Sequence, residues 1–159
     1  ECATMQVHMP GAPVWVLPWG PWLVGNPKAI DRAIAQEAQK QGLQPLPVRQ
    51  GYSACSVALV DGESAITADQ GMFQALRTKG FAVLLIRPGH IALPGYDTGF
   101  IGGCCGKLAP DKLAFAGALS SHPDGERMRE FLHSRCVAPV ELRESPLVDV
   151  GGILPLRER

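Results

Sequence analysis

One order of elements recurs along this chain of 159 residues: strand, strand, helix, strand. In the most complete pass, expected strands at residues 56–60 and 65–67 flank an Asp61-Gly62 turn, which strongly favours a hairpin. A helix capped by Asp69 then runs to about residue 78, and the apolar run at residues 81–86 predicts a strand buried on both faces. A period of roughly 40 to 55 residues is typical of repeat architectures and propellers.

The other passes are less regular. The first begins with Asn26 as a helix N-cap and Pro27 at the first helical position, and apolar residues then recur at helical spacing up to Gly42. The last has a helix that starts at Ser121 or Asp124 and ends near residue 134. The remaining expected strands are residues 46–49, 100–103, 113–119 and 137–142, with a final pair at residues 147–150 and 153–156. The pattern predicts an α/β fold with two fairly complete units and two partial ones.

The first 25 residues have a different character. All three tryptophans lie in an apolar stretch at residues 9–25, but four prolines interrupt it, whereas a membrane-spanning helix needs about 20 mostly apolar residues. Proline restricts φ and removes a backbone donor. We therefore expect an irregular segment over residues 1–25, followed by an α/β domain over residues 26–159, and no membrane association.

Charge and cysteine content exclude several classes of partner. The 15 basic and 15 acidic side chains cancel, so the chain has no excess positive charge for nucleic acid or a membrane surface. The five cysteines are an odd number and include the adjacent pair Cys104 and Cys105. This favours free thiols in a reducing compartment over a disulfide framework, and we expect a cytoplasmic protein.

The stretch most suited to function is residues 87–106, which holds six of the 18 glycines together with His90, Tyr96 and Asp97. Glycine is required where φ is positive or where another group approaches the backbone closely, so this stretch predicts a shaped surface. The pair Cys104-Cys105 has no second pair or histidine at metal-ligand spacing. Neither zinc nor a phosphate-binding loop nor a cofactor is expected there.

Several segments together resemble an uncharacterised bacterial family assigned to the guanidino-group-modifying enzyme fold, also called the pentein β/α-propeller. They are GYSACSVALV, AITAD, VLLIRPGHIALPGYDTGFIGG, FAGAL with SHPDG, and PLVDVGGIL, and the resemblance covers about residues 26–156. It implies a ring of five units, of which this chain would hold an incomplete set. Other members of the fold are arginine deiminases, amidinotransferases, dimethylarginine hydrolases and a non-catalytic initiation factor. Catalytic members carry a late cysteine beside a glycine-rich turn, where this chain has Gly151, Gly152 and Ile153.

Three residues are candidates for catalysis. Cys55 follows a Gly51-Tyr52 turn, and its thiolate would be a nucleophile if a neighbouring cation lowered the pKa; the alternative is a small apolar core residue. His122 and Asp124 resemble the histidine and acid that catalytic members use for proton transfer. The alternative for Asp124 is to cap the following helix.

Three further residues are candidates for substrate binding: His90, Asp97 and Asp149. The two aspartates lie at turns or strand ends, where a carboxylate can bind a guanidinium through paired hydrogen bonds, whereas Asp69 is explained as an N-cap. Two functions stay open. One is an enzyme or binding protein for a small guanidino or amidino compound, and the other is a non-catalytic module that binds a macromolecular partner. Because an incomplete ring leaves strand edges unpaired, self-association is also expected.

Overall fold

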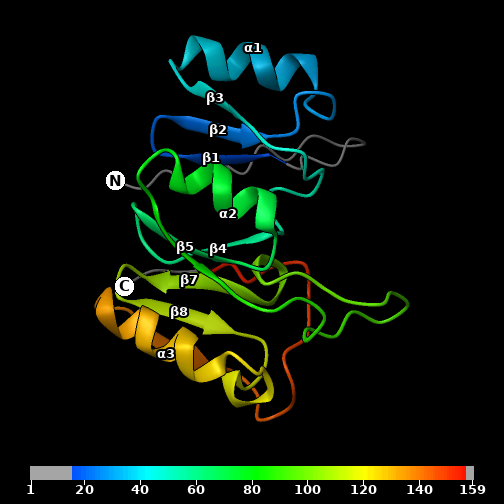
Figure 1. Cartoon of the computed structure of the whole chain (residues 1–159), viewed down its shortest axis with the longest axis vertical. Coiled ribbons are helices and arrows are strands. Elements are labelled where there is room, and N and C mark those ends of the chain that lie inside the picture. The colour runs from blue at the N-terminus through cyan, green and yellow to red at the C-terminus, as the bar shows by residue number, and fades with distance from the viewer. Residues whose placement is uncertain (1–15, 157–159) are drawn as a thin grey trace. The chain divides into compact units, whose positions relative to one another are not determined.

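The order strand, strand, helix, strand occurs three times in the computed structural model, which describes residues 16–156 (Figure 1). The described residues form a mixed α/β structure with three three-stranded sheets and three α-helices. They divide after Ala54 into two compact units. Residues 1–15, including Cys2, lie outside the described part.

Each repeat is a hairpin followed by a helix and a third strand. The first repeat lies in the first compact unit and the other two in the second. In every repeat the middle strand pairs antiparallel with the first strand and parallel with the third. The elements are β1 (Leu17–Trp19), β2 (Trp22–Gly25), α1 (Arg32–Lys40) and β3 (Gln44–Pro47); β4 (Val57–Leu59), β5 (Ser64–Thr67), α2 (Gln70–Arg77) and β6 (Ala82–Leu85); and β7 (Cys105–Ala109), β8 (Lys112–Phe115), α3 (Gly125–Ser134) and β9 (Ala138–Glu141). The predicted repeat order is confirmed, with three complete repeats in place of two complete and two partial ones.

All three helices end in the same way. The residue after the C-cap region has a positive φ, which is 74° at Gly42, 86° at Gly80 and 55° at Cys136. The next residue donates its N–H to the carbonyl five residues earlier, as in a Schellman motif: Leu43 to Ala38, Phe81 to Leu76 and Val137 to Leu132. Cys136 thus occupies a backbone conformation that favours glycine.

The prediction that Asn26 begins the first helix is wrong. Helix α1 starts at Arg32, because the Asp31 carboxylate accepts the N–H of Ala33 at 2.7 Å and caps it. The Asn26 side chain accepts the N–H of Lys28 at 3.0 Å, so it closes a local turn instead.

The expectation of irregular chain before residue 26 is also wrong over residues 17–25, which form the β1–β2 hairpin. Pro18 lies on β1, an outer strand of its sheet, where a missing donor is tolerated. Gly20, with a φ of 55°, and Pro21 make the turn. The prolines therefore restrict where the strands lie without preventing them.

Two expected strand pairs near the end of the chain are not found. Residues 100–103 lead into a 3₁₀-helix (Gly102–Cys104), and the hairpin partner of β8 is β7. Residues 147–156 form no strand, although Val148 makes a single parallel bridge with Ala92. These segments are instead held by hydrogen bonds between residues far apart in sequence.

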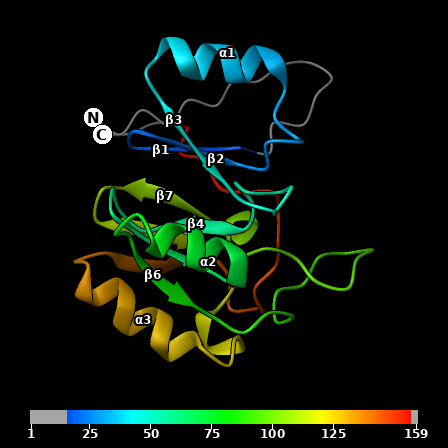
Figure 2. The same cartoon turned by 45° about the horizontal axis from the view of Figure 1, so that its top comes forward.

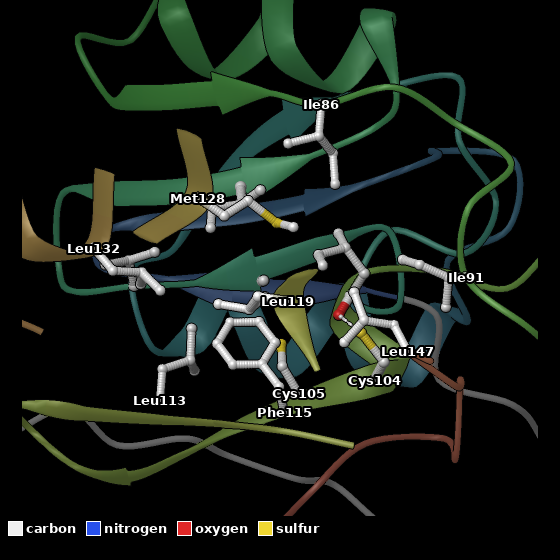
Figure 3. Close-up of a cluster of buried hydrophobic side chains, with 14 of the residues drawn as sticks. Ile86, Ile91, Cys104, Cys105, Leu113, Phe115, Leu119, Met128, Leu132 and Leu147 are labelled. Atoms are coloured by element: carbon white, nitrogen blue, oxygen red, sulfur yellow. Dashed lines mark hydrogen bonds between the residues drawn. The ribbon is translucent and has the colours of Figure 1, made fainter. Parts of the chain in front are cut away.

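The core of the second compact unit joins both of its sheets to α3. Figure 3 shows Phe115 of β8 with Met128 and Leu132 of α3, and each of these side chains is fully buried. Strand β6 runs between α2 and α3 in the view of Figure 2, and its Leu84 packs against this core. Strand β6 was expected to be buried on both faces, but only Val83 is buried and the other three residues are half-buried.

Within residues 16–156, no helix has the length and apolar character needed to cross a bilayer.

Candidate functional site

Asp124 is at the centre of the most densely connected polar cluster in the second unit. It takes the N-cap position of α3, but its side chain makes no capping hydrogen bond. Its carboxylate accepts four others: from Arg87 N at 2.7 Å, Arg87 Nε at 3.2 Å, Arg87 Nη2 at 3.1 Å and Arg127 Nη1 at 2.9 Å. Only 2% of Asp124 is exposed. Hydrogen bonds from the Arg87 side chain hold the pKa of this carboxyl well below its usual range.

His122 connects the two sides of this cluster through its ring. Its Nδ1 accepts the N–H of Asp124 at 2.9 Å, so this nitrogen carries no proton. The Nε2 atom then donates to the carbonyl of Arg87 at 3.1 Å. Burial lowers the pKa of His122, which keeps the ring neutral. A proton can be taken up at Nδ1 only if the bond from Asp124 N–H breaks.

His90 lies beside His122. The two ring centroids are 5.3 Å apart with the rings nearly perpendicular. The turn that carries His90 contains Gly89, whose φ of 88° is one that glycine adopts readily. The structure therefore brings three of the predicted site residues together, and His90 is the exposed one.

The two arginines of this cluster were not among the predicted site residues. Arg127 lies three residues after Asp124, a spacing at which helical side chains are neighbours, so the sequence held a usable indication of this pair. Arg87 is 37 residues from Asp124, and no local pattern indicates that contact.

Asp149 forms a second, separate group with the glycine-rich stretch. Its Oδ2 accepts the N–H of Phe100 and its Oδ1 the N–H of Gly151, both at 2.9 Å. The carboxylate packs directly on the backbone, because a Cβ added at Gly103 would lie 2.1 Å from Oδ1. A Cβ at Gly99 would lie 2.5 Å from the Cβ of Asp149. These contacts hold the segment around Asp149 against residues 99–103.

Cys55 lies near Asp149, and its surroundings oppose thiolate formation. Burial is the main cause that raises its pKa, and the negative charge of Asp149 adds to it. The same two causes raise the pKa of Cys104 to about 12, and burial raises that of Cys105 well above its ordinary value. The thiol of Cys104 donates to the carbonyl of Ile101 at 3.2 Å. None of these three cysteines has the electropositive surroundings of a reactive thiol.

Asp97 belongs to neither group. It is exposed, next to Tyr96, which is 75% exposed. Both residues lie in the segment between β6 and the 3₁₀-helix, which forms a projecting loop in Figures 1 and 2. A turn places them there: Tyr96 N–H donates to the carbonyl of Leu93 at 3.0 Å, and Gly95 has a φ of 85°. Among the described residues, Asp97 has no hydrogen-bonding partner.

The candidate residues thus fall into two groups, one around Asp124 with His90 and His122, and one around Asp149 with Cys55. No hydrogen bond among residues 16–156 joins the two groups. The same part of the chain holds no set of three or more histidine, cysteine, aspartate or glutamate side chains that could bind a metal ion.

Comparison with known families covers almost all of the described chain. The model of a family of unknown function, DUF6873, matches residues 14–154. The chain belongs to this family. The match spans all three repeats and both groups of candidate residues, so the polar clusters lie within the family's own domain. No curated protein and no solved structure matches the chain.

Proposed function

We propose that this chain is a non-catalytic binding module with the pentein β/α-propeller fold. The observation that carries the proposal is that the two residues expected to transfer protons are engaged elsewhere. Both ring nitrogens of His122 are hydrogen-bonded to the backbone, and the Asp124 carboxylate accepts four hydrogen bonds from this chain's own arginines. A general acid or base must reach a ligand atom to act on it.

The cysteine chemistry supports the same proposal. Hydrolysis of a guanidino compound by a cysteine would need a thiolate, but the pKa of Cys55 is raised, with Asp149 nearby. The Asp149 carboxylate accepts one backbone N–H on each oxygen and packs against Gly103, so it already has a structural role within this chain. A binding function requires neither a thiolate at Cys55 nor proton transfer by His122 and Asp124.

The other open function is turnover of a small guanidino or amidino compound, and an activity assay separates the two. The purified protein is incubated with arginine, an N-methylated arginine and agmatine, and ammonia and ureido products are measured. We expect no product above that formed by the Cys55→Ser variant. Product formed by the wild type and lost in both Cys55→Ser and His122→Asn, with unchanged melting temperatures, would show an enzyme.

Two further expectations belong with this proposal. Cys55, Cys104, Cys105 and Cys136 are free thiols, which suits a reducing compartment, and we propose a cytoplasmic location. Self-association stays a prediction, which sedimentation velocity over a range of protein concentrations tests directly.

A further inference from the structure

Arg87 and Arg127 form a pair of cations whose positions are set by one buried carboxylate. Arg87 Nη2 and Arg127 Nη1 both donate to Oδ1 of Asp124, at 3.1 and 2.9 Å. Their side chains are nevertheless 61% and 55% exposed. Two guanidinium groups therefore lie next to each other at the surface, and their hydrogen bonds to the buried Asp124 carboxylate set their orientation.

Each arginine keeps donors that the protein does not use. Arg87 bonds through Nε and Nη2, the latter also to the carbonyl of Pro123, and this leaves both N–H groups of Nη1. Arg127 makes one hydrogen bond through Nη1 and one through Nη2, which leaves its Nε–H and one N–H on each Nη. Among residues 16–156, these remaining donors have no acceptor in the protein.

Several ionisable groups surround the pair. Two arginines face one carboxylate, and the exposed ring of His90 lies beside His122, whose Nε2 is bonded to the Arg87 carbonyl. Glu126 and Glu130, the acidic residues of α3 near Arg127 in the sequence, are exposed, and within residues 16–156 neither makes a hydrogen bond to the two arginines. An anion that reaches this surface meets donors that are already oriented, so little side-chain entropy is lost on binding.

We propose that Arg87 and Arg127, together with the exposed His90, bind the phosphoryl group of a small anionic molecule. A phosphoryl group has three terminal oxygens and nearly two negative charges, whereas a carboxylate has two oxygens and one charge, so two adjacent guanidinium groups attract the phosphoryl group more strongly. The inference rests on the proposed binding function, because it assigns the ligand chemistry of the Asp124 cluster.

The test is a titration of the isotopically labelled protein with inorganic phosphate, followed through the Nε–Hε resonances of the arginines at constant ionic strength. Constant ionic strength is needed because salt screens any general attraction between charges. We expect the resonances of Arg87 and Arg127 to shift and saturate in the millimolar range, with weaker binding of acetate. Absence of saturation, or equal shifts at all arginines, overturns the proposal.

A matched pair of variants tests the assignment. Arg127→Gln removes one donor set but leaves three hydrogen bonds from Arg87 to Asp124, and we expect phosphate affinity to fall at least about tenfold. Arg143→Gln removes the same charge from the exposed arginine that follows β9, and we expect less than about a twofold change. Equal losses in the two variants would mean attraction by net charge alone.

The outcome is distinct from that of the activity assay. Turnover of guanidino compounds together with phosphate binding at Arg87 and Arg127 would overturn the proposed function and retain the anion site. Absence of both turnover and phosphate binding would retain the non-catalytic proposal and overturn the anion site. Should Arg127→Gln fail to fold, His90→Gln takes its place, because His90 is exposed and its one described interaction is the ring contact with His122.

Discussion

Replacing Asp124 by asparagine tests whether the buried carboxylate supports the structure. The amide keeps the shape of the side chain but removes its charge, and one of its two polar atoms becomes a donor. Oδ2 accepts from the main-chain N–H and Nε of Arg87, and Oδ1 accepts from Arg87 Nη2 and Arg127 Nη1. Whichever way the amide lies, its NH₂ group therefore faces two donors.

The size of the effect follows from this geometry. Two of the four hydrogen bonds are lost and the other two lose the charge of their acceptor. A hydrogen bond to a charged group contributes about 1.5–3 kcal/mol to stability, whereas an exposed ion pair contributes only about 0–1 kcal/mol. Because the Asp124 carboxylate is buried and its arginines are half-exposed, we expect the contribution of each of its interactions to lie between these two ranges. We expect the free energy of unfolding to fall by about 2–3 kcal/mol, which for a unit of this size lowers the melting temperature by about 8–12 °C.

The assay is thermal unfolding followed by circular dichroism at pH 7. Asp97→Asn is the matched control, because Asp97 is exposed and has no partner among the described residues, and its change should stay within about 0.5 kcal/mol. The reasoning is refuted if Asp124→Asn is as stable as the wild type or more stable.

Three further predictions follow from the described contacts. Iodoacetamide should label Cys136 before Cys55, because Cys136 is exposed whereas the pKa of Cys55 is raised. Gly103→Ala should lower the free energy of unfolding in urea by at least about 2 kcal/mol, since the new methyl group would lie 2.1 Å from an oxygen of Asp149. The free energy of unfolding should fall as the pH drops below about 6.5, because His122 binds a proton in the unfolded chain at a pH where folded His122, with its lowered pKa, stays neutral. His122→Asn should remove this part of the pH dependence.

Each of these has a control or a contrary result. Labelling of Cys55 ahead of Cys136 would restore the nucleophile hypothesis. Gly62→Ala is the control for the glycine substitution, because nothing lies within 4 Å of a Cβ at that position, and it should cost far less. A His122→Asn variant with the wild-type dependence on pH would show that another group is responsible.

The order of the elements could be predicted because its determinants are local. The Asp61-Gly62 turn and the helix ends at Gly42 and Gly80 each depend on a few neighbouring residues. The chain near residues 100–103 and 147–156 could not be predicted in this way. Its conformation depends on contacts such as that between Phe100 and Asp149, which are 49 residues apart.

The candidate site was predictable in its members more than in their roles. His90, His122 and Asp124 do come together, and Asp149 does lie near Cys55. What each group does depends on partners from distant segments. The neutral ring of His122 is hydrogen-bonded to the N–H of Asp124, two residues away, and to the carbonyl of Arg87. No spacing rule indicates the contact with Arg87.

The three helices offer a comparison within one chain, because each begins after an aspartate. Asp31 and Asp69 accept an N–H of the first helical turn and act as caps, but Asp124 turns to Arg87 and Arg127 instead. An absent cap costs about 1 kcal/mol, so α3 gives up local stability for a contact that orients two exposed arginines. If that orientation serves phosphate binding, Asp124→Asn should lower both stability and phosphate affinity. Gly103→Ala should lower stability alone, since Gly103 packs against Asp149 in the other group. Equal phosphate affinity in the two variants, at a temperature where both are folded, would show that the Asp124 carboxylate is not needed for phosphate binding.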